Sequence, residues 1–367
     1  MTGNSIGKDF IVTTFGESHG AVVGVVIDGC PAGLPLQEMD FQEELDRRIP
    51  AEPKIVSARV EKDTAKLLSG VFKGHTTGAP IAIIVENKET NSNDYETIKN
   101  LPRPGHSDYP ARVRYGGFND YRGGGRFSGR ITVAIILAGV VAKKLIGRYN
   151  VDVLAYTKAI GKIKSEKIFG IAEIRKNRNK AATRCPDLAC GERMEEAIVA
   201  AKEAGDSLGG VVECLALNMP VGVGDPLFDA LDADLAKALF CVPAVKGVEF
   251  GAGFKSAELQ GSENNDAFLV KGGKVITATE NSGGILGGLS SGMPIVIRAA
   301  IKPTPSISKE QQTINVSSMQ NSSISVKGRH DPCVVPKAVP AVEATVAIIL
   351  ADHLIRSGEI PKILKEQ

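Results

Sequence analysis

Tryptophan is absent from this chain of 367 residues, and aromatic residues make up only 5% of it. Neither sign of charge dominates, because 44 Lys and Arg oppose 42 Asp and Glu, for a net charge of +2. A protein that coats nucleic acid or lies on a membrane surface would show a strong excess of one sign. With 43% hydrophobic and 23% charged residues, the composition also excludes disorder as the main state.

Long hydrophobic runs are missing as well. The longest, at 131–142 and 345–351, fall short of the ~20 residues that a membrane-spanning helix needs, and the N-terminal MTGNSIGKDF has no apolar core for a signal peptide. Six cysteines are scattered without a C-x-x-C pair, and the closest two, Cys185 and Cys190, have no histidine nearby. We therefore expect a cytoplasmic protein with reduced thiols, no membrane segment and no metal site.

Strands and helices alternate along the chain without a regular period. Four β-branched runs predict strands at 10–15, 22–27, 55–60 and 81–85. Apolar spacing and capping residues predict helices at 38–48, 131–145, 193–204, 226–240 and 338–355. This order favours an α+β fold, with large antiparallel sheets in layers around buried helices. We expect one domain over residues 1–367, with a mobile loop at 306–325 over a site.

The most unusual segment, at 103–130, reads RPGHSDYPARVRYGGFNDYRGGGRFSGR. It holds six of the chain's 17 arginines and seven glycines, and it has no lysine. A planar guanidinium binds phosphate or carboxylate in a bidentate manner, as an ammonium group does not. Glycines let backbone N–H groups approach the same anion. The segment therefore predicts an anion-binding site that includes His106.

Two other interpretations of this segment stay open on composition. It is a solvated surface loop, or it binds single-stranded RNA, with Tyr109, Tyr115 and Tyr121 as stacking platforms between the arginines. The low aromatic content and the near-neutral remainder of the chain count against RNA, so we expect no nucleic-acid partner.

Histidine marks two further segments. His19 lies in FGESHG at 15–20, which fits the G-x-S-x-G pattern of serine hydrolases, but a β-branched strand follows where that motif needs a helix. In KGRHDPC, at 327–333, basic, imidazole and carboxylate groups are adjacent. Residue types alone thus predict a lyase or transferase for a small phosphorylated acid, with two or three histidines and Asp331 for proton transfer.

Two turn-forming segments complete the set. The glycine-rich run NSGGILGGLSSG at 281–292 has neither the pattern of a dinucleotide site nor that of a P-loop. KPTPS at 302–306 forms a rigid turn headed by a cation.

Taken together, these segments resemble the chorismate synthase family. The motifs TTFGESHG, LDRR, GHTTGAP, RPGHSDY, GGILGGLSSGMPI, KPTPSI and KGRHDPC follow the family's order and cover nearly the whole chain. The resemblance implies a β-α-β sandwich, a homotetramer, and a 1,4-elimination of phosphate and a ring proton from 5-enolpyruvylshikimate 3-phosphate. That reaction yields chorismate for aromatic amino acids and needs reduced FMN. With no additional segment for a flavin reductase, we expect a monofunctional enzyme that receives reduced flavin from an external source.

The resemblance also implies catalytic roles for five residues. His19 serves the departing phosphate as a proton donor, and His106 lies near N1 and the C2 carbonyl of the flavin. Asp331 lies near flavin N5 and takes part in removing the ring proton. Ser18 and Ser128 are candidates for a proton relay.

The binding residues implied by the resemblance form a larger set. Expected FMN contacts are Arg126, Phe127, Ser128, Pro243, Ala244, Gly287, Lys302, Pro303, Thr304, Pro305, Ser306 and Arg329. Expected ligands for phosphate or carboxylate groups of substrate or nucleotide, NADP included, are Arg48, Lys54, Arg103 and Arg130.

The chain departs from the family pattern near the expected flavin. Many members have Arg-Ser-Ser-Ala-Arg-Glu where residues 126–131 read RFSGRI, so Phe127 and Ile131 replace polar residues. Lys54 stands where an arginine is usual. The alternative to an enzyme is therefore an inactive homologue that binds flavin or phosphate without turnover.

Overall fold

The structure, a computed structural model, describes residues 3–49, 55, 62–88, 95–96, 98–326 and 330–365. Most of the strand expected at 55–60 lies outside these residues, as do the expected ligands Lys54 and Arg329.

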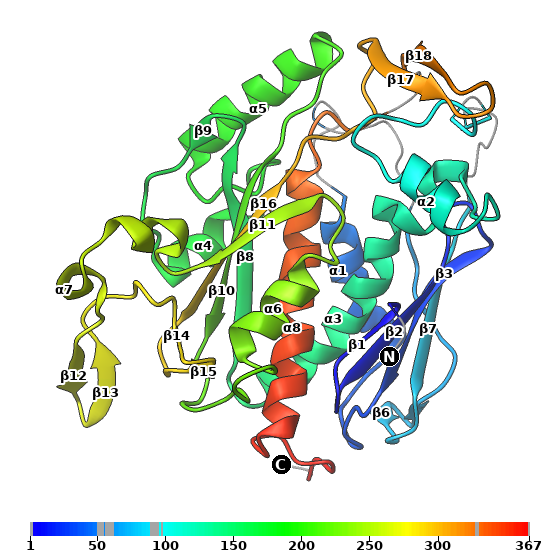
Figure 1. Cartoon of the computed structure of the whole chain (residues 1–367). Coiled ribbons are helices and arrows are strands. Elements are labelled where there is room, and N and C mark those ends of the chain that lie inside the picture. Colours follow the sequence, from blue (N-terminus) through cyan, green and yellow to red (C-terminus); the bar gives the residue numbers. More distant parts are fainter. Residues whose placement is uncertain are drawn as a thin grey trace.

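Two five-stranded antiparallel sheets form the outer layers (Figure 1). The first has the strand order β1 (Ser5–Ile6), β2 (Ile11–Gly16), β3 (Val22–Asp28), β7 (Ile81–Glu86) and β4 (Lys66–Leu67). The second has the order β11 (Val245–Phe250), β16 (Ile295–Ile301), β10 (Gly210–Leu217), β8 (Asp152–Ile160) and β9 (Ile163–Lys164). Three of the four predicted strands are confirmed to within a residue at each end.

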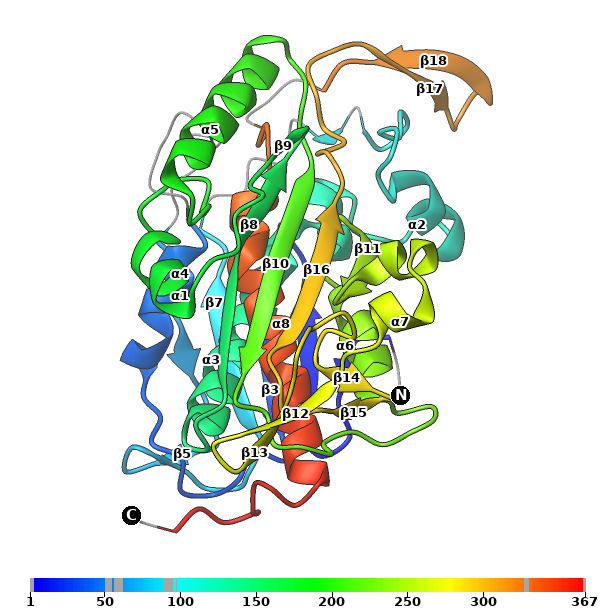
Figure 2. The ribbon, with the colours of Figure 1, turned by 90° about the vertical axis from the view of Figure 1, so that its left-hand side faces the viewer.

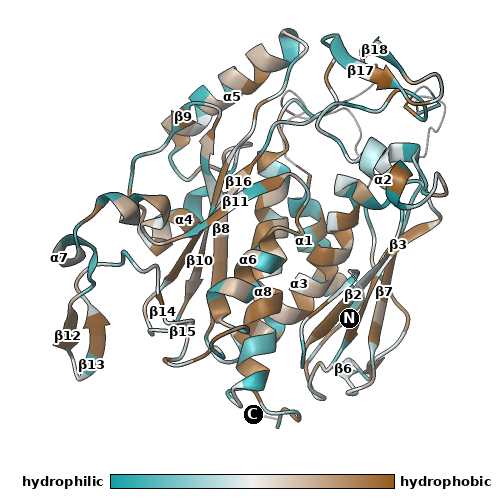
Figure 3. Ribbon diagram, in the orientation of Figure 1, coloured by the Kyte–Doolittle hydropathy of each residue, from teal (hydrophilic) through white to brown (hydrophobic). Residues whose placement is uncertain are grey.

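Two apolar helices fill the space between the sheets (Figure 3). Helix α3 (Thr132–Gly147) packs against β2, β3 and β7, and α8 (Val335–Arg356) packs against β8 and β10. The two helices approach closely at Gly139, where a Cβ atom would lie 2.7 Å from the Cα of Ala344. Both are mostly apolar because both are largely buried. The predicted α+β layers around buried helices are therefore confirmed.

The two central helices run in the same direction. Asp152, which follows α3, pairs with Leu217 at the end of β10. Cys333, which precedes α8, pairs with Leu208 just before the start of β10. Helix α3 therefore ends at one end of β10 and α8 begins at the other, which places both helix N-termini at the same end of the molecule (Figures 1 and 2).

Helix α8 is more apolar than the sequence analysis recognised. By length and composition it could cross a membrane, but its apolar stretch is completely buried inside the protein. It begins at Val335, three residues earlier than predicted, with Pro336 in its first turn, where a missing N–H costs nothing.

Smaller elements surround this frame. The other helices are η1 (Glu38–Phe41), α1 (Gln42–Arg47), α2 (Asp108–Arg114), η4 (Arg122–Phe127), η5 (Gly129–Ile131), α4 (Ile171–Asn177), α5 (Leu188–Glu203), α6 (Leu231–Leu239), η6 (Gly253–Glu258) and α7 (Gly261–Asn264). Four hairpins pair β5 (Val71–Phe72) with β6 (His75–Thr76), β12 (Phe268–Lys271) with β13 (Lys274–Thr277), β14 (Ile285–Leu286) with β15 (Leu289–Ser290), and β17 (Gln311–Asn315) with β18 (Gln320–Ile324).

Three sequence-based predictions need correction. The helix predicted at 193–204 is α5, which begins five residues earlier, at Leu188. The helix predicted from residue 226 begins only at Leu231, because Asp225 forms a bridge with Asp229 and its carboxylate pairs with Arg356 instead of capping a helix. The segment 306–325, predicted as a mobile loop, contains the β17–β18 hairpin, which is held because Ile324 packs in a small apolar cluster.

Candidate active site

A turn of three glycines lies between the two predicted catalytic histidines. Gly123, Gly124 and Gly125 all have positive φ, at 59°, 82° and 53°. A Cβ atom on Gly123 would lie 2.6 Å from Nε2 of His19, and one on Gly124 would lie 3.2 Å from Nε2 of His106. Only glycine combines this backbone with such close approach, so the turn brings the two imidazoles to either side of one short backbone segment.

His19 lies in the loop that connects β2 to β3. The loop is part of a β-hairpin, so FGESHG is not a nucleophile elbow, in agreement with the strand predicted after it. The N–H of Ser18 donates to the carbonyl of Gly125 at 3.2 Å, and the His19 ring lies 5.1 Å from that of Tyr95, edge to face. His19 is 7% exposed. The loop therefore holds its imidazole in a fixed place against the glycine turn.

His106 is held by a short contact to a carboxylate in its own segment. Its Nδ1 lies 2.6 Å from Oδ1 of Asp108, while Arg103 donates from Nε and Nη2 to the two oxygens of Asp108, each at 2.8 Å. Burial opposes ionisation of Asp108, but hydrogen bonds from Arg103 and His106 outweigh it and hold its pKa well below the usual range. Asp108 is therefore a carboxylate at neutral pH.

The turn at 302–306 closes one side of this cluster. Ser306 accepts a hydrogen bond from Nη1 of Arg103 at 3.0 Å, and Nζ of Lys302 donates to the carbonyl of Gly105. The N–H of Lys302 also donates to the carbonyl of Ala244 at 2.9 Å. Burial, and then the charge of Lys246, lower the pKa of Lys302. The expected flavin contacts at 302–306 therefore lie beside the segment that carries His106, and Ala244 adjoins them through Lys302.

Two expected anion ligands, Arg48 and Arg130, converge on one buried carboxylate. Nη1 of Arg130 lies 2.7 Å from Oδ1 of Asp63, and Nη1 of Arg48 lies 3.3 Å from Oδ2. Nε of Arg130 also donates to Oδ1 of Asn87 at 2.8 Å. Both guanidinium groups stand near the N-terminus of α3, where Arg48 contacts the hydroxyl of Thr132 at 3.4 Å.

Residues 126–128 have more local roles than expected. Nη2 of Arg126 donates to the carbonyl of Thr14 at 2.8 Å and to the side chain of Asn4 at 3.0 Å. Ser128 caps η5, accepting from the N–H of Arg130 at 3.2 Å. Phe127 is 40% exposed and lies 6.5 Å from the Tyr115 ring. The guanidinium of Arg126 thus fastens the glycine segment to β2.

Asp331 lies just before α8 and is paired with Lys337 in its first turns. Nζ of Lys337 donates to both carboxylate oxygens of Asp331, at 2.7 Å each. Because α3 and α8 are parallel, their N-termini, with partial positive charge, face the end of the molecule that carries Asp331 and the glycine turn.

Among the described residues, Gly287 is an expected FMN contact that does not lie in this cluster within a single chain. It lies in the β14–β15 turn before β16, whereas Lys302 follows β16. The seven residues of β16 span roughly 20 Å at 3.3 Å each. Figure 1 shows β14 and β15 far from α2.

Sequence reasoning missed Asn87 and Asp63. Asn87 donates from Nδ2 to the carbonyls of Glu17 and Gly20, at 3.0 Å and 2.8 Å, on either side of His19. Neither residue stands in a motif, and both act on partners distant in the sequence. The sequence analysis also assigned no role to Asp108.

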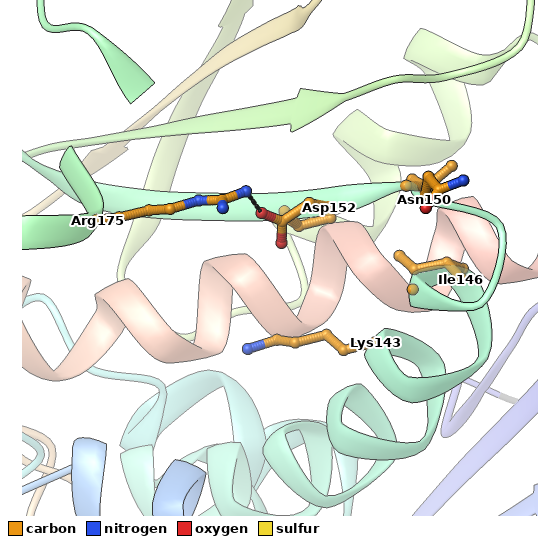
Figure 4. A pocket seen from close by; sticks show the side chains of 8 residues that line it. Lys143, Ile146, Asn150, Asp152 and Arg175 are labelled. Carbon is orange, nitrogen blue, oxygen red and sulfur yellow. Dashed lines mark hydrogen bonds and ion pairs between the residues drawn. The ribbon is translucent and has the colours of Figure 1, made fainter. Parts of the chain in front are cut away.

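A cavity of about 260 Å³ lies at the opposite end of the central helices, near the end of α3 (Figure 4). Its charged lining is already paired: Arg175 with Asp152, and Lys143 with Glu44 and Glu343. The cavity therefore offers an anion no better site than the glycine turn. Within the described residues, no group of three or more His, Cys, Asp or Glu side chains is placed to hold a metal ion.

The fold and the site define a class of protein: an α+β protein in which two histidines flank a glycine turn, at the end of the molecule that carries several arginines and the N-termini of α3 and α8. Such a site fits a small substrate with several negative charges.

Comparisons with known proteins agree with this class. The family model described as chorismate synthase matches residues 10–355. A chorismate synthase from Dehalococcoides mccartyi is 51% identical over 99% of this chain and 100% of its own length, and one from Methanocella arvoryzae is 53% identical over 98% and 96%. A crystal structure of chorismate synthase superposes with a TM-score of 0.75 at 29% identity, covering 96% of this chain and 93% of the other. The chain belongs to the chorismate synthase family.

Proposed function

We propose that this chain catalyses the reaction of its family, the elimination of phosphate and a ring proton from 5-enolpyruvylshikimate 3-phosphate to give chorismate. One observation carries the proposal: His19 and His106 lie on either side of the turn at 123–125, and the guanidinium of Arg103 lies beside His106. This substrate has one phosphate and two carboxylates, which suits a site rich in fixed cations.

Each proposed role follows from where the residue lies. His19, buried beside the glycine turn, donates a proton to the departing phosphate, which is a poorer leaving group without it. Arg48 and Arg130 bind the anionic groups of the substrate and hold it near the N-terminus of α3.

Removal of the ring proton is assigned to Asp331. This carboxylate accepts the proton, and the ammonium of Lys337 keeps the carboxylate oriented. Ser18 and Ser128, whose N–H groups both bond to the carbonyl of Gly125, are the candidates for a relay.

The described residues also fit reduced FMN. A Cβ at Gly124 would fill the space beside His106, and Lys302 with the turn at 302–306 provides a cation and hydroxyl groups for a phosphate. When bound, reduced FMN supplies an electron-rich ring beside the substrate.

The arginines of the segment 103–130 have different roles. The guanidinium of Arg126 is hydrogen-bonded to Thr14 and Asn4. The proposed contact of Arg126 with FMN therefore involves its backbone. Arg103 likewise supports His106 and leaves substrate binding to the other arginines.

We also propose that the chain forms a homotetramer. The β12–β13 hairpin exposes apolar side chains, among them Phe268, Leu269, Val270 and Val275. Figure 3 shows the hydrophobic colouring of this hairpin. A two-stranded hairpin is marginal alone, and exposed apolar patches mark interfaces. In such an assembly Gly287 would contact the FMN of a neighbouring copy. Light scattering that gave the mass of a monomer, 38.7 kDa, would contradict this proposal.

The chain is further proposed to act in the cytoplasm and to depend on reduced flavin from an external source. The purified chain with NADPH and oxidised FMN should then give no chorismate. Turnover under these conditions would show a flavin reductase activity in the chain itself.

The deciding experiment is an anaerobic assay with 5-enolpyruvylshikimate 3-phosphate and chemically reduced FMN. We expect equal amounts of chorismate and phosphate with reduced FMN, and none with oxidised FMN. Folded protein that binds FMN but yields no product would identify an inactive flavin-binding homologue. Ile131 is buried in the core and Phe127 packs on Tyr115, so we expect both changes to be compatible with turnover.

A further inference from the structure

The best-defined polar contacts of the site belong to a residue without an assigned role. Asp108 accepts from the backbone N–H of Arg103 at 3.0 Å, from Nε and Nη2 of the same arginine at 2.8 Å each, and lies 2.6 Å from Nδ1 of His106. The side chains of Arg103, Asp108 and His106 are only 6%, 9% and 14% exposed. A buried carboxylate with this many partners has a single orientation.

We propose that Asp108 is a positioning residue for His106: it accepts the Nδ1–H of the imidazole and so fixes the tautomer whose Nε2 carries a lone pair toward the glycine turn. A carboxylate can only accept, so the nitrogen that faces it must carry the proton. The inference deepens the proposed function, and its catalytic meaning rests on that function.

Arg103 determines the charge of this unit. Its Nη2 lies 3.1 Å from Nδ1 and 3.3 Å from Nε2 of His106, and nearly equal distances to both nitrogens place it over the face of the ring. The lone pair of Nε2 in the ring plane therefore stays available. The guanidinium neutralises Asp108, so the unit as a whole has no net charge while the imidazole is neutral.

Other charged groups face the unit from the neighbouring segments. Lys302 of the 302–306 turn bonds to the carbonyl of Gly105, next to His106. On the far side of the glycine turn stands His19. Ser306 fixes Nη1 of Arg103. None of these neighbours offers an acceptor that competes with Asp108 for the Nδ1 proton.

Nitrogen NMR of the flavin-free protein tests the proposal directly. The chain has five histidines, so selective ¹⁵N-histidine labelling gives few signals, and the His106→Gln variant identifies those of His106. Solid-state spectra at pH 8 should show His106 with a protonated Nδ1 and an unprotonated Nε2. A protonated Nε2 in the wild type would overturn the proposal without any variant of Asp108.

The Asp108→Asn variant links the tautomer to function. Its amide can donate to Nδ1, so we expect the His106 signals to shift toward the other tautomer and kcat to fall about 10- to 100-fold, with KM changed little. Asp108→Glu should restore part of the wild-type tautomer and part of the wild-type kcat. Asp152→Asn, which breaks an exposed Arg–Asp pair remote from the histidines, is the matched control and should change neither signal nor rate.

The outcomes separate this inference from the proposed function. The expected tautomer in a protein that yields no chorismate would leave the positioning by Asp108 intact and refute the function. An unchanged tautomer and rate in Asp108→Asn would refute the positioning and leave the function intact.

Discussion

Asn87 and Arg130 are joined through their side chains, with Nε of Arg130 2.8 Å from Oδ1 of Asn87. The Nδ2 of the same amide donates to the carbonyls of Glu17 and Gly20, on either side of His19. One amide thus fixes the loop of a proposed general acid relative to a proposed substrate ligand. Asn87 directly follows β7, and β7 pairs with β3 in the first sheet. The sheet therefore helps to align Asn87 with the loop that carries His19.

The variant Asn87→Ala should therefore lower turnover through displacement of His19 and Arg130. We expect kcat to fall about tenfold or more, since small misplacements of reacting groups are costly, and the free energy of unfolding to fall by about 1–3 kcal/mol. Anaerobic turnover and urea unfolding measure the two effects. Asn218→Ala, which removes an exposed amide bonded to the carbonyl of Asn150, is the control and should keep its turnover. Equal losses of kcat in the two variants would contradict a specific role for Asn87.

Replacing Gly123 by alanine should displace His19. The added Cβ would stand 2.6 Å from Nε2 of His19 and 2.7 Å from Oγ of Ser18, so we expect kcat to fall about 100-fold. Gly117→Ala is the matched control, because Gly117 also has positive φ, at 81°, but open space around it. Both variants should lose about 1–2 kcal/mol from backbone strain. Only Gly123→Ala should lose activity.

Variants of His19 and His106 should both lower turnover but should differ in their effect on FMN binding. His19→Ala and His106→Ala should each slow turnover about 100-fold or more, as loss of general acid–base help does. Because His106 lies beside the turn at 302–306, its variant should also weaken FMN binding in an anaerobic titration, whereas His19→Ala should not. Rates near wild type in both variants would refute the assignment.

Lys337 should determine how well Asp331 works as a base. Lys337→Met removes the ammonium that bonds to both oxygens of Asp331, and we expect kcat to fall about tenfold while FMN still binds. Lys309→Met breaks a comparable but exposed pair with Asp206 and serves as the control. Unchanged turnover in Lys337→Met would show that the carboxylate needs no support.

The sequence predicts much of the fold because burial leaves a local pattern. The runs at 22–27 and 81–85 are rich in β-branched residues since both are interior strands, and the helix at 131–145 is apolar up to Ala142 since most of that stretch is buried. The start of α6 was predicted wrongly because Asp225 does not cap a helix; its carboxylate bonds to Arg356, 131 positions away. A partner so distant in the sequence cannot be predicted from the local pattern.

The same distinction holds for the site. Histidines, arginines and glycines stand out by type and spacing, so His19, His106 and the glycine turn were predicted. The contacts of these side chains were not predicted. Arg103 has the residue type of an anion ligand, yet its guanidinium is engaged by Asp108 and Ser306. The supporting contacts of Asn87 and Asp63 depend on tertiary structure, since their partners come from other strands and helices.

Loss of the Glu343 carboxylate should lower the stability of the fold. It is 1% exposed in α8 and pairs with Lys143 at 2.6 Å, with Arg47 at 2.8 Å and with Arg178. Burial alone would raise its pKa, but the three cations outweigh burial and hold that pKa well below 4.5. Glu343→Gln leaves the three cations facing one another, and we expect a loss of about 3–5 kcal/mol in urea unfolding at pH 7.

The pH dependence of this loss has a definite sign. The folded-state pKa is depressed, so the stabilisation by Glu343 is complete above the unfolded-state value of about 4.5 and disappears as the pH falls below it. The difference between wild type and Glu343→Gln should therefore be largest near pH 7 and shrink below pH 4.5. Glu166→Gln, which breaks an exposed pair with Lys164, should leave the urea midpoint nearly unchanged at both pH values. A difference that stayed constant with pH would mean that Glu343 acts through packing and not through its charge.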